Sequence, residues 1–418
     1  MNLKAPRGTK DILPPESYLW LEIEQVVDDV ARLFGFDEIR TPIFESSALF
    51  KRGVGETTDI VSKEMYLFSD KGGEEMALRP ELTASVVRSA IEHNLISQQG
   101  ALQRLYYNSA PMFRYERPQM GRQRQFHQFG VEVLGAASPL ADLQTIAFAI
   151  AVYNRLGFKN FLLKLNTLGS DVSRMQWRSE LVTYLRDNLD ALSDDSKRRV
   201  EDNPLRVLDS KNPADQVIAA KAPSILDHLD AGDKEHFEEL KVLLDAAGIK
   251  YEVTPTLVRG LDYYSRTVYE LTSSDLGSQD ALCGGGRYDG LVKQLGGPDT
   301  PAVGFAAGVE RLVIVLQKMR GAAERPAIDC YIAVQAENAK KTLIDLAAGI
   351  RNAGSSVMYD LQGRSMKAQM READRLKSRY VLIIGADELA RGEVTLKNMK
   401  TGEQSVLPVA EASNLKLS

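Results

Sequence analysis

The pattern of apolar residues changes at the segment 321–327, and this change constrains the fold more than any other feature of the chain. Beyond it, short apolar runs alternate with helical patterns. The expected elements are, in order, strand 330–334, helix 336–352, strand 357–361, helix 365–378 and strand 380–385. Such alternation predicts a small α/β domain with a mainly parallel sheet. A hairpin turning at Lys400, Thr401 and Gly402 should end it.

Before this segment, strand-like runs follow one another without alternating helices. These runs cover residues 65–68, 75–79, 104–116, 125–135 and 161–169. Helices are expected at 19–34, where apolar residues recur every three or four positions, and at 82–93 and 141–156. The absence of regular βαβ units disfavours a Rossmann arrangement and predicts an antiparallel sheet.

A helix-rich stretch, charged in both signs, interrupts the strand pattern after Ser170. The strands return at residue 251 and continue through a glycine-rich run to a strand that leads into a helix. We therefore predict an α+β domain with an antiparallel sheet, a helical insertion and a C-terminal α/β domain. The expected boundaries are 1–170 and 251–322 for the two parts of the first domain, 171–250 for the insertion and 328–418 for the last domain.

Composition excludes several classes of protein. The 44% hydrophobic and 26% charged residues are typical of a soluble globular chain, and no apolar stretch is long enough to cross a bilayer. The N-terminus has no signal-peptide core, so the cytoplasm is the expected location. The two cysteines and four histidines show no metal-binding spacing, so no metal site built on thiolates or histidines is expected. A net charge of −5 argues against indiscriminate nucleic-acid binding but not against a specific RNA partner.

The densest candidate chemistry lies between Met112 and Gly135. Arg114 and Glu116 are expected on one face of a strand, and Phe126, Gln128 and Glu132 on one face of the next. A basic loop joins the strands, so these side chains would face a common cleft. Arginine forks suit phosphates, an aromatic ring can stack on a purine, and a carboxylate can accept from an exocyclic amine. The alternative for this segment is a solvated basic hairpin.

Three further segments are ambiguous when each is taken alone. LVRGLDYY (257–264) is either part of a site or a turn before a core strand. GGGRYDGL (284–291) permits close approach of its backbone to a ligand or a neighbouring strand, with a tight turn as the alternative, and it lacks the Walker sequence. GFAAGVERL (304–312) is either an ordinary core helix with a surface arginine or a strand and helix that present Arg311 to a terminal phosphate.

Taken together, these segments resemble the three motifs of class II aminoacyl-tRNA synthetases. GFDEIRTPIFE (35–45) resembles motif 1, FRYE followed by RQRQFHQFGVE resembles motif 2, and GFAAGVERL resembles motif 3. LVRGLDYY, GGGRYDGL, the opening PRGTKDILP and LRPELT (78–83) are similar to segments of bacterial-type histidyl-tRNA synthetases. The resemblance extends over essentially the whole chain. It implies a catalytic domain with a helical insertion over the tRNA acceptor stem, and an anticodon-binding domain.

The resemblance also implies roles for individual residues. Arg114 and Arg259 would flank the α-phosphate, with Arg114 also on the amino-acid carboxylate. The other implied ATP contacts are Glu116 and Phe126 on the adenine and Arg122 and Arg311 on the γ-phosphate. The implied histidine contacts are Glu81, Thr83 and Gln128 on the α-amino group and Glu132, Tyr263 and Tyr264 around the imidazole. Arg117 and Gln119 would face the acceptor end of the tRNA.

The implied reaction joins L-histidine to tRNA(His) through a histidyl-adenylate, with ATP and Mg²⁺ as the substrate complex, no prosthetic group, and Mg²⁺ ligands left unidentified. The family also implies a homodimer. Lys367, Arg371 and Arg375 recur on one helical face and are candidates for RNA backbone contacts, with a plain solvated face as the alternative. Two rivals remain: a non-aminoacylating regulatory subunit of ATP phosphoribosyltransferase, and a proline- or threonine-type synthetase. Residues 328–418 and the intact VRGLDYY argue against the first rival, and VRGLDYY with GGGRYDGL against the second.

Overall fold

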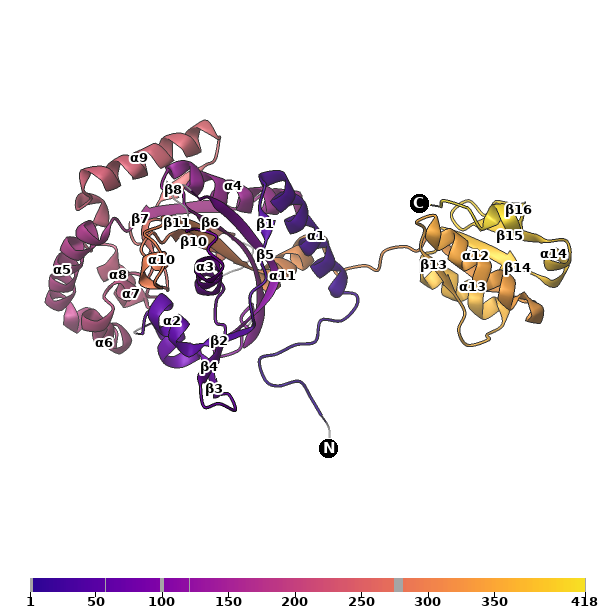
Figure 1. The fold of residues 1–418 in the computed structure, drawn as a ribbon, viewed down its shortest axis with the longest axis horizontal. Helices are drawn as coiled ribbons and strands as arrows, with labels where there is room; N and C mark the ends of the chain where they lie inside the picture. The colour runs from indigo at the N-terminus through magenta and orange to yellow at the C-terminus, as the bar shows by residue number, and fades with distance from the viewer. Residues whose placement is uncertain (1–2, 57, 98–100, 120, 274–280, 418) are drawn as a thin grey trace. The chain divides into compact units, whose positions relative to one another are not determined.

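The computed structural model describes residues 3–56, 58–97, 101–119, 121–273 and 281–417. Met120 of the motif 2 loop lies outside the described residues. The chain forms two compact units, Met1–Ala322 and Ala323–Ser418, whose helices and strands are labelled in Figure 1. The division falls inside the segment where the sequence pattern changes.

The first unit is built on an eight-stranded sheet of order β1-β5-β6-β11-β10-β9-β7-β8. Its strands are β1 (Asp37–Glu38), β5 (Gln103–Phe113), β6 (Gln125–Leu134), β7 (Leu162–Thr167), β8 (Tyr251–Val253), β9 (Ser265–Thr272), β10 (Ala281–Arg287) and β11 (Ala302–Gly308). Every pair is antiparallel except β1–β5 and β7–β8 at the two edges. The predicted antiparallel sheet is therefore confirmed, with parallel pairing at both edges.

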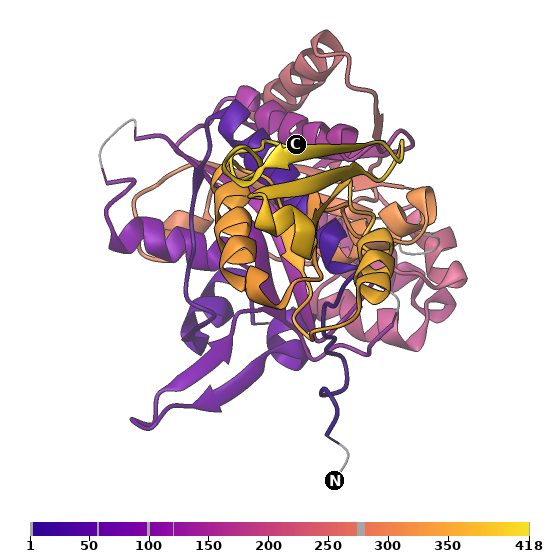
Figure 2. The same ribbon diagram turned by 90° about the vertical axis from the view of Figure 1, so that its right-hand side faces the viewer.

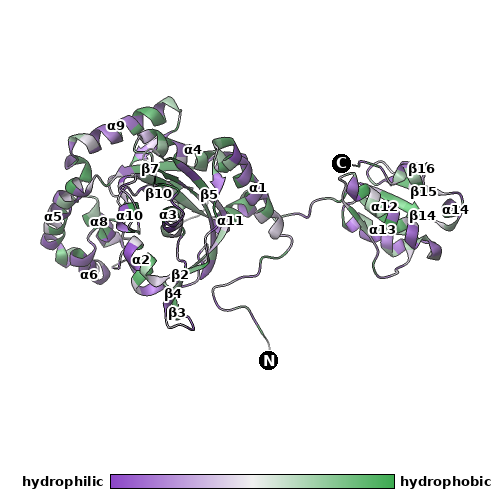
Figure 3. Ribbon diagram, in the orientation of Figure 1, coloured by the Kyte–Doolittle hydropathy of each residue, from purple (hydrophilic) through white to green (hydrophobic). Residues whose placement is uncertain are grey.

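Three helices pack together against this sheet. They are α1 (Ser17–Phe34), α4 (Pro139–Arg155) and α11 (Val309–Arg320). The buried stripe of α1 contains Ile23, Val27 and Val30, and the helix ends at Gly35 in the left-handed conformation, as the sequence predicts. Figure 3 shows apolar colour along the sheet and α4, while α5, α6 and α9 carry many polar residues.

The predicted helical stretch is confirmed between β7 and β8. Its helices are α5 (Asp171–Asp187), α6 (Asp194–Asp202), α7 (Leu205–Leu208), α8 (Pro213–Ala219) and α9 (Ala231–Ala246), with 3₁₀ turns at Leu189–Ala191 and Ile225–Asp227. Trp177 and Leu181 of α5 are buried in the same apolar cluster as Val258 and Tyr264. The insertion therefore shares a core with the loop that precedes β9.

A second, three-stranded sheet has the order β2-β4-β3. It contains β2 (Phe44–Ser46), β3 (Tyr66–Ser69) and β4 (Glu75–Leu78). The neighbouring helices are α2 (Ser47–Val54), the π-helix Ile60–Glu64, α3 (Thr83–Glu92) and α10 (Leu291–Gln294). The β3–β4 hairpin projects from this unit at the lower left of Figure 2.

The second unit has a five-stranded sheet of order β13-β12-β14-β15-β16. Its elements are β12 (Cys330–Val334), the 3₁₀ turn Glu337–Ala339, α12 (Lys340–Asn352), β13 (Val357–Tyr359), α13 (Met366–Arg375), β14 (Tyr380–Ile384), α14 (Ala386–Ala390), β15 (Glu393–Asn398), β16 (Gln404–Pro408) and α15 (Val409–Ala412). The first three strands are parallel, and the predicted hairpin adds two antiparallel ones. The sheet is thus mixed rather than mainly parallel.

Candidate active site

A cleft of ≈ 890 Å³ opens beside the central strands of the large sheet. Strands β6, β9, β10 and β11, the loop before β9 and the start of α3 all contribute to its walls. It brings together residues that the sequence places far apart. The predicted site residues that line it are Glu81, Thr83, Arg114, Glu116, Arg122, Phe126, Gln128, Arg259, Tyr263, Tyr264 and Arg311.

Strand β6 presents Phe126 and Gln128 to the cleft because alternate residues of a strand face the same side. Phe126 lies 5.2 Å from the Arg114 guanidinium, measured from the Arg114 Cζ atom to the ring centroid. Gln128 Oε1 is buried and has no hydrogen-bond partner among the residues that the structure describes. A buried acceptor without a partner is costly, so this oxygen is suited to a donor on a ligand.

One sequence expectation is wrong in detail. Arg114 and Glu116 do not share a strand face, because β5 ends at Phe113. The Arg114 amide still donates one hydrogen bond to the opposite segment, to the Arg124 carbonyl at 2.9 Å. The backbone then turns, and the Glu116 amide donates to the Arg114 carbonyl at 2.7 Å. Both side chains still reach the cleft, where Arg122 Nη1 donates to Glu116 Oε2 at 2.9 Å.

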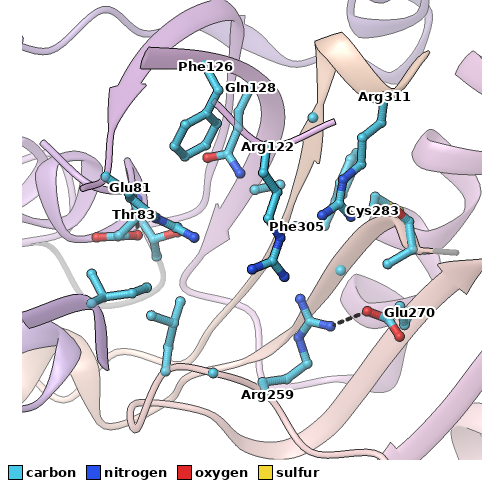
Figure 4. Close-up of a pocket in the computed structure, with 18 of the residues that line it drawn as sticks. Glu81, Thr83, Arg122, Phe126, Gln128, Arg259, Glu270, Cys283, Phe305 and Arg311 are labelled. Carbon is cyan, nitrogen blue, oxygen red and sulfur yellow. Dashed lines mark hydrogen bonds and ion pairs between the residues drawn. The ribbon is translucent and has the colours of Figure 1, made fainter. Parts of the chain in front are cut away.

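One end of the cleft is strongly cationic. Figure 4 shows Arg122, Arg259 and Arg311 extending into the same space from three different segments. Burial, and after it the nearby Arg122 guanidinium, lower the pKa of Arg311. Burial also acts to lower the pKa of Arg259, but the Glu270 carboxylate outweighs it and the net shift is upward. Guanidinium groups held this close repel one another, so the region favours a polyanion.

The other end of the cleft is lined by polar side chains around the start of α3. Glu81 accepts hydrogen bonds from the amides of Thr83 and Ala84, at 2.8 and 2.9 Å, and so caps that helix. Burial raises the pKa of Glu81, and the two amides oppose that shift. The rings of Tyr263 and Tyr264 lie with their centroids 4.7 Å apart in the wall beside them.

Glu132 lies beneath the cleft and does not line it. Its carboxylate accepts from Thr83 Oγ1 at 2.7 Å and from the Tyr288 hydroxyl. Burial raises the pKa of Glu132 to about 8, although both hydrogen bonds act in the opposite direction. A Cβ atom on Gly304 would come within 1.9 Å of Glu132 Oε2, so the neighbouring strand needs glycine here.

Several lining residues had escaped sequence reasoning. Glu270, Tyr107 and Tyr288 come from strands or glycine-rich segments, and the last lies inside the GGGRYDGL signature. The insertion also contributes lining residues: Arg206, Asp209, Lys211 and Gln216. Nothing in its charged pattern distinguishes these four from solvent-facing neighbours. Arg287, by contrast, is fully buried against Asp142 and supports the fold.

Arg117 and Gln119 are not among the residues that line the cleft. Gln119 exchanges backbone hydrogen bonds with Arg122, at 3.1 and 2.9 Å, which closes the tip of the loop. Their contact with tRNA stays a prediction.

Among the described residues, no group of three or more His, Cys, Asp or Glu side chains is arranged to hold a metal ion. No described helix is long and apolar enough to span a bilayer.

Comparison with known proteins agrees with this geometry. The family model described as "Histidyl-tRNA synthetase" matches residues 8–312, and "Anticodon binding domain" matches 329–415. Proteins named histidine--tRNA ligase from Picosynechococcus sp. and Chloroherpeton thalassium are each 50% identical to this chain. The first match covers 98% of this chain and 95% of the relative, and the second covers 98% and 97%.

Solved structures show the same likeness. The apo histidyl-tRNA synthetase of S. aureus has a TM-score of 0.81 and 36% identity, with 99% of both chains covered. A Bacillus halodurans structure titled as an ATP phosphoribosyltransferase regulatory subunit/histidyl-tRNA synthetase shares the fold, at a TM-score of 0.63 and 23% identity, over 92% of this chain and 98% of that one. From the family match over most of its length and the relatives at half identity, the chain belongs to the histidyl-tRNA synthetase family.

Proposed function

We propose that this chain activates L-histidine with ATP and transfers it to tRNA(His). One observation carries the proposal. A single cleft has a cluster of guanidinium groups, Arg122, Arg259 and Arg311, and it also holds the buried acceptor Gln128 Oε1, which has no partner among the described residues. A triphosphate suits the guanidinium cluster and an α-amino group suits the acceptor. Arg114, which also lines the cleft, would contact both the amino-acid carboxylate and the α-phosphate.

In the first step, a carboxylate oxygen of histidine attacks the α-phosphorus of ATP, and the bond to the β-phosphate oxygen breaks to release pyrophosphate. This step needs alignment and charge neutralisation more than acid–base catalysis, because both partners are anions. Arg114 and Arg259 would hold the α-phosphate, and Arg122 and Arg311 the γ-phosphate. In the second step, a 3′-terminal ribose hydroxyl of the tRNA attacks the carbonyl carbon of the histidyl-adenylate. The carbon–oxygen bond to AMP breaks, and the hydroxyl proton passes to the departing AMP phosphate or to solvent.

Histidine would be selected by its imidazole, which offers one donor and one acceptor when neutral. Tyr264 is the proposed partner in the cleft wall, with Tyr263 packed beside it, and Glu132 would reach the imidazole from beneath the cleft. Glu81, Thr83 and Gln128 would hold the amino group. An amino acid without matching polar atoms would leave buried groups unpaired. Such a mismatch is expected to be rejected on the order of 10⁴-fold.

ATP would bind with Phe126 and Glu116 on its adenine. Mg²⁺ would arrive with ATP as part of the substrate and neutralise phosphate charge. The carboxylates that line the cleft include four with protein partners: Glu81 caps α3, Glu116 pairs with Arg122, Glu270 with Arg259 and Glu310 with His127. Mg²⁺ commonly relies on substrate phosphates for many of its ligands, which fits this arrangement.

Transfer RNA would contact both units. Arg117 and Gln119 belong to the loop that joins β5 and β6, and Lys367, Arg371 and Arg375 are carried by α13. We further propose cytoplasmic location, a homodimer, and the division into 1–170 with 251–322, 171–250 and 328–418. Limited proteolysis tests the last boundary: cleavage within 321–327 should release two resistant fragments.

The proposal is tested by ATP–pyrophosphate exchange with each amino acid in turn, in the wild type and in Arg259→Ala. Exchange with histidine alone, strongly reduced in the variant, is the expected result. Exchange with proline or threonine instead would favour another class II specificity. Folded protein without exchange for any amino acid would overturn the proposal and favour the regulatory-subunit rival.

A further inference from the structure

The Arg259 side chain is held by a second residue that no sequence motif marks. Arg259 Nη1 donates to Glu270 Oε1 at 2.9 Å, the contact drawn as a dashed line in Figure 4. Arg259 comes from the loop before β9, whereas Glu270 lies within β9 and lines the cleft. The loop is therefore tied to the sheet through the same guanidinium that faces the phosphate region.

A glycine makes this arrangement possible. Gly284 of β10 lies opposite Glu270 in the sheet register. A Cβ atom on Gly284 would fall 1.9 Å from Arg259 Nη2, and the three nearest atoms it would meet all belong to that guanidinium. Arg259 thus lies against the strand in a slot that any side chain at position 284 would fill.

The slot and the ion pair together fix the direction of the cation. Glu270 engages Nη1, and Arg259 Nε is buried without a partner among the described residues. The guanidinium donors that Glu270 does not engage, Nε among them, remain for a phosphate. Arg122 and Arg311 face the same space, and their repulsion would push an untethered guanidinium aside. A cation fixed before substrate arrives stabilises developing charge without reorganisation cost.

We infer that Glu270 is a positioning residue for adenylate formation, acting through Arg259 and dependent on the Gly284 slot. The inference rests on the proposed function, because it assigns Glu270 a part in that same activation step. The competing assignment for this carboxylate is direct contact with Mg²⁺ of the substrate. The two assignments predict different effects on exchange when Glu270 is changed in a variant that already lacks Arg259.

The test is steady-state ATP–pyrophosphate exchange with histidine in the full chain, comparing wild type, Glu270→Gln, Glu270→Asp and Gly284→Ala. Displacing a catalytic group by about 1 Å can lower the reaction rate on the order of 10²-fold. We expect Glu270→Gln and Gly284→Ala to lower kcat by roughly 10- to 100-fold, with KM for histidine within about 3-fold of the wild type. Glu270→Asp should recover part of the loss, because it keeps the charge.

A matched control is Glu252→Gln. Glu252 is exposed on β8 of the same sheet and is not among the residues that line the cleft, so this variant should exchange like the wild type. If the wild type exchanges but Glu270→Gln matches it within about 2-fold, the positioning role is wrong while the proposed function stands. If the wild type itself does not exchange, the proposed function fails first.

A double-variant cycle separates positioning from metal contact. Added to Arg259→Ala, Glu270→Gln should cause no further loss of exchange, because its effect passes through the missing guanidinium. The Mg²⁺ concentration for half-maximal exchange should be unchanged in Glu270→Gln. A further loss in the double variant, or a several-fold rise in that Mg²⁺ concentration, would overturn the inference in favour of direct metal contact.

Discussion

At the scale of single residues, Glu132 shows what burial does to a charge in this site. It accepts from two hydroxyl groups, those of Thr83 and Tyr288. Its raised pKa, about 8, follows from burial that the two hydrogen bonds only partly offset. Gly304 leaves room for the carboxylate, just as Gly284 leaves room for Arg259. At both positions the absence of a side chain shapes the site.

This raised pKa predicts a pH-dependent stability difference for Glu132→Gln. Between about pH 4.5 and about 8, Glu132 is ionised in the unfolded chain but protonated in the folded one, so wild-type stability from this group falls as pH rises. The amide that replaces the carboxyl group in the variant does not titrate. The difference in Tm between variant and wild type, measured at about pH 5 and about pH 8, should move in favour of the variant at the higher pH. A difference independent of pH would contradict the assignment.

At the scale of elements, one carboxylate joins the short helices α6, α7 and α8 of the insertion. Asp215 at the start of α8 accepts from the Ser193 amide and from the hydroxyls of Ser193, Ser196 and Ser210, at 2.6–2.7 Å. It thereby joins the first turn of α6, the segment after α7 and the first turn of α8. Each of these helices is too short to be stable by itself. Packing against the apolar face of α5 therefore does not fix them without the hydrogen bonds to Asp215.

We expect Asp215→Asn to destabilise the insertion by about 2 kcal/mol or more, since several hydrogen bonds to a charged group are weakened at once. The midpoint of urea unfolding measures this, with exposed Asp190→Asn as the control.

The contribution of Asp215 to the free energy of unfolding depends on pH with a definite sign. Burial opposes ionisation of Asp215, but the serine donors outweigh it and lower its pKa from 3.8 to about 2. Its contribution is therefore complete above pH 3.8 and lost as pH falls toward 2. Equal unfolding midpoints for Asp215→Asn and Asp190→Asn at neutral pH would show that the serine network is not stabilising.

At the scale of the whole molecule, the first unit leaves an apolar surface uncovered. Phe44 and Phe68, on the same face of the three-stranded sheet, are 54% and 42% exposed, and their rings lie 6.1 Å apart. Exposed apolar groups gathered in this way mark interaction surfaces. Part of the patch belongs to the segment that resembles motif 1, which supports the proposed homodimer.

The double variant Phe44→Ser/Phe68→Ser is therefore expected to have a lower mass than the wild type at concentrations where the proposed homodimer forms. Light scattering coupled to size exclusion measures the mass. Val242→Ser, a change at a comparably exposed apolar residue on α9, should leave the dimer intact. If the double variant keeps the mass of a dimer, the interface lies elsewhere.

The sequence alone was enough to predict most helices and strands, the antiparallel sheet, the change of architecture near residue 322, and a shared site for the arginines of three separate segments. The elements and the sheet follow from local periodicity, whereas the shared site for the arginines was implied by the resemblance of the separate motifs to class II synthetases. It failed where β5 ends at Phe113, because that end depends on a turn made by backbone hydrogen bonds at Arg114 and Glu116.

Only the tertiary structure placed Glu270 against Arg259, opened the slot at Gly284, and brought Arg206 from the insertion to the cleft. These contacts join segments with no common local pattern, and they depend on strand register and on which face of each strand is covered. A charged residue in a strand or helix looks the same to local sequence reasoning whether it meets solvent or a guanidinium. The physical difference arises only when the chain brings its partner alongside.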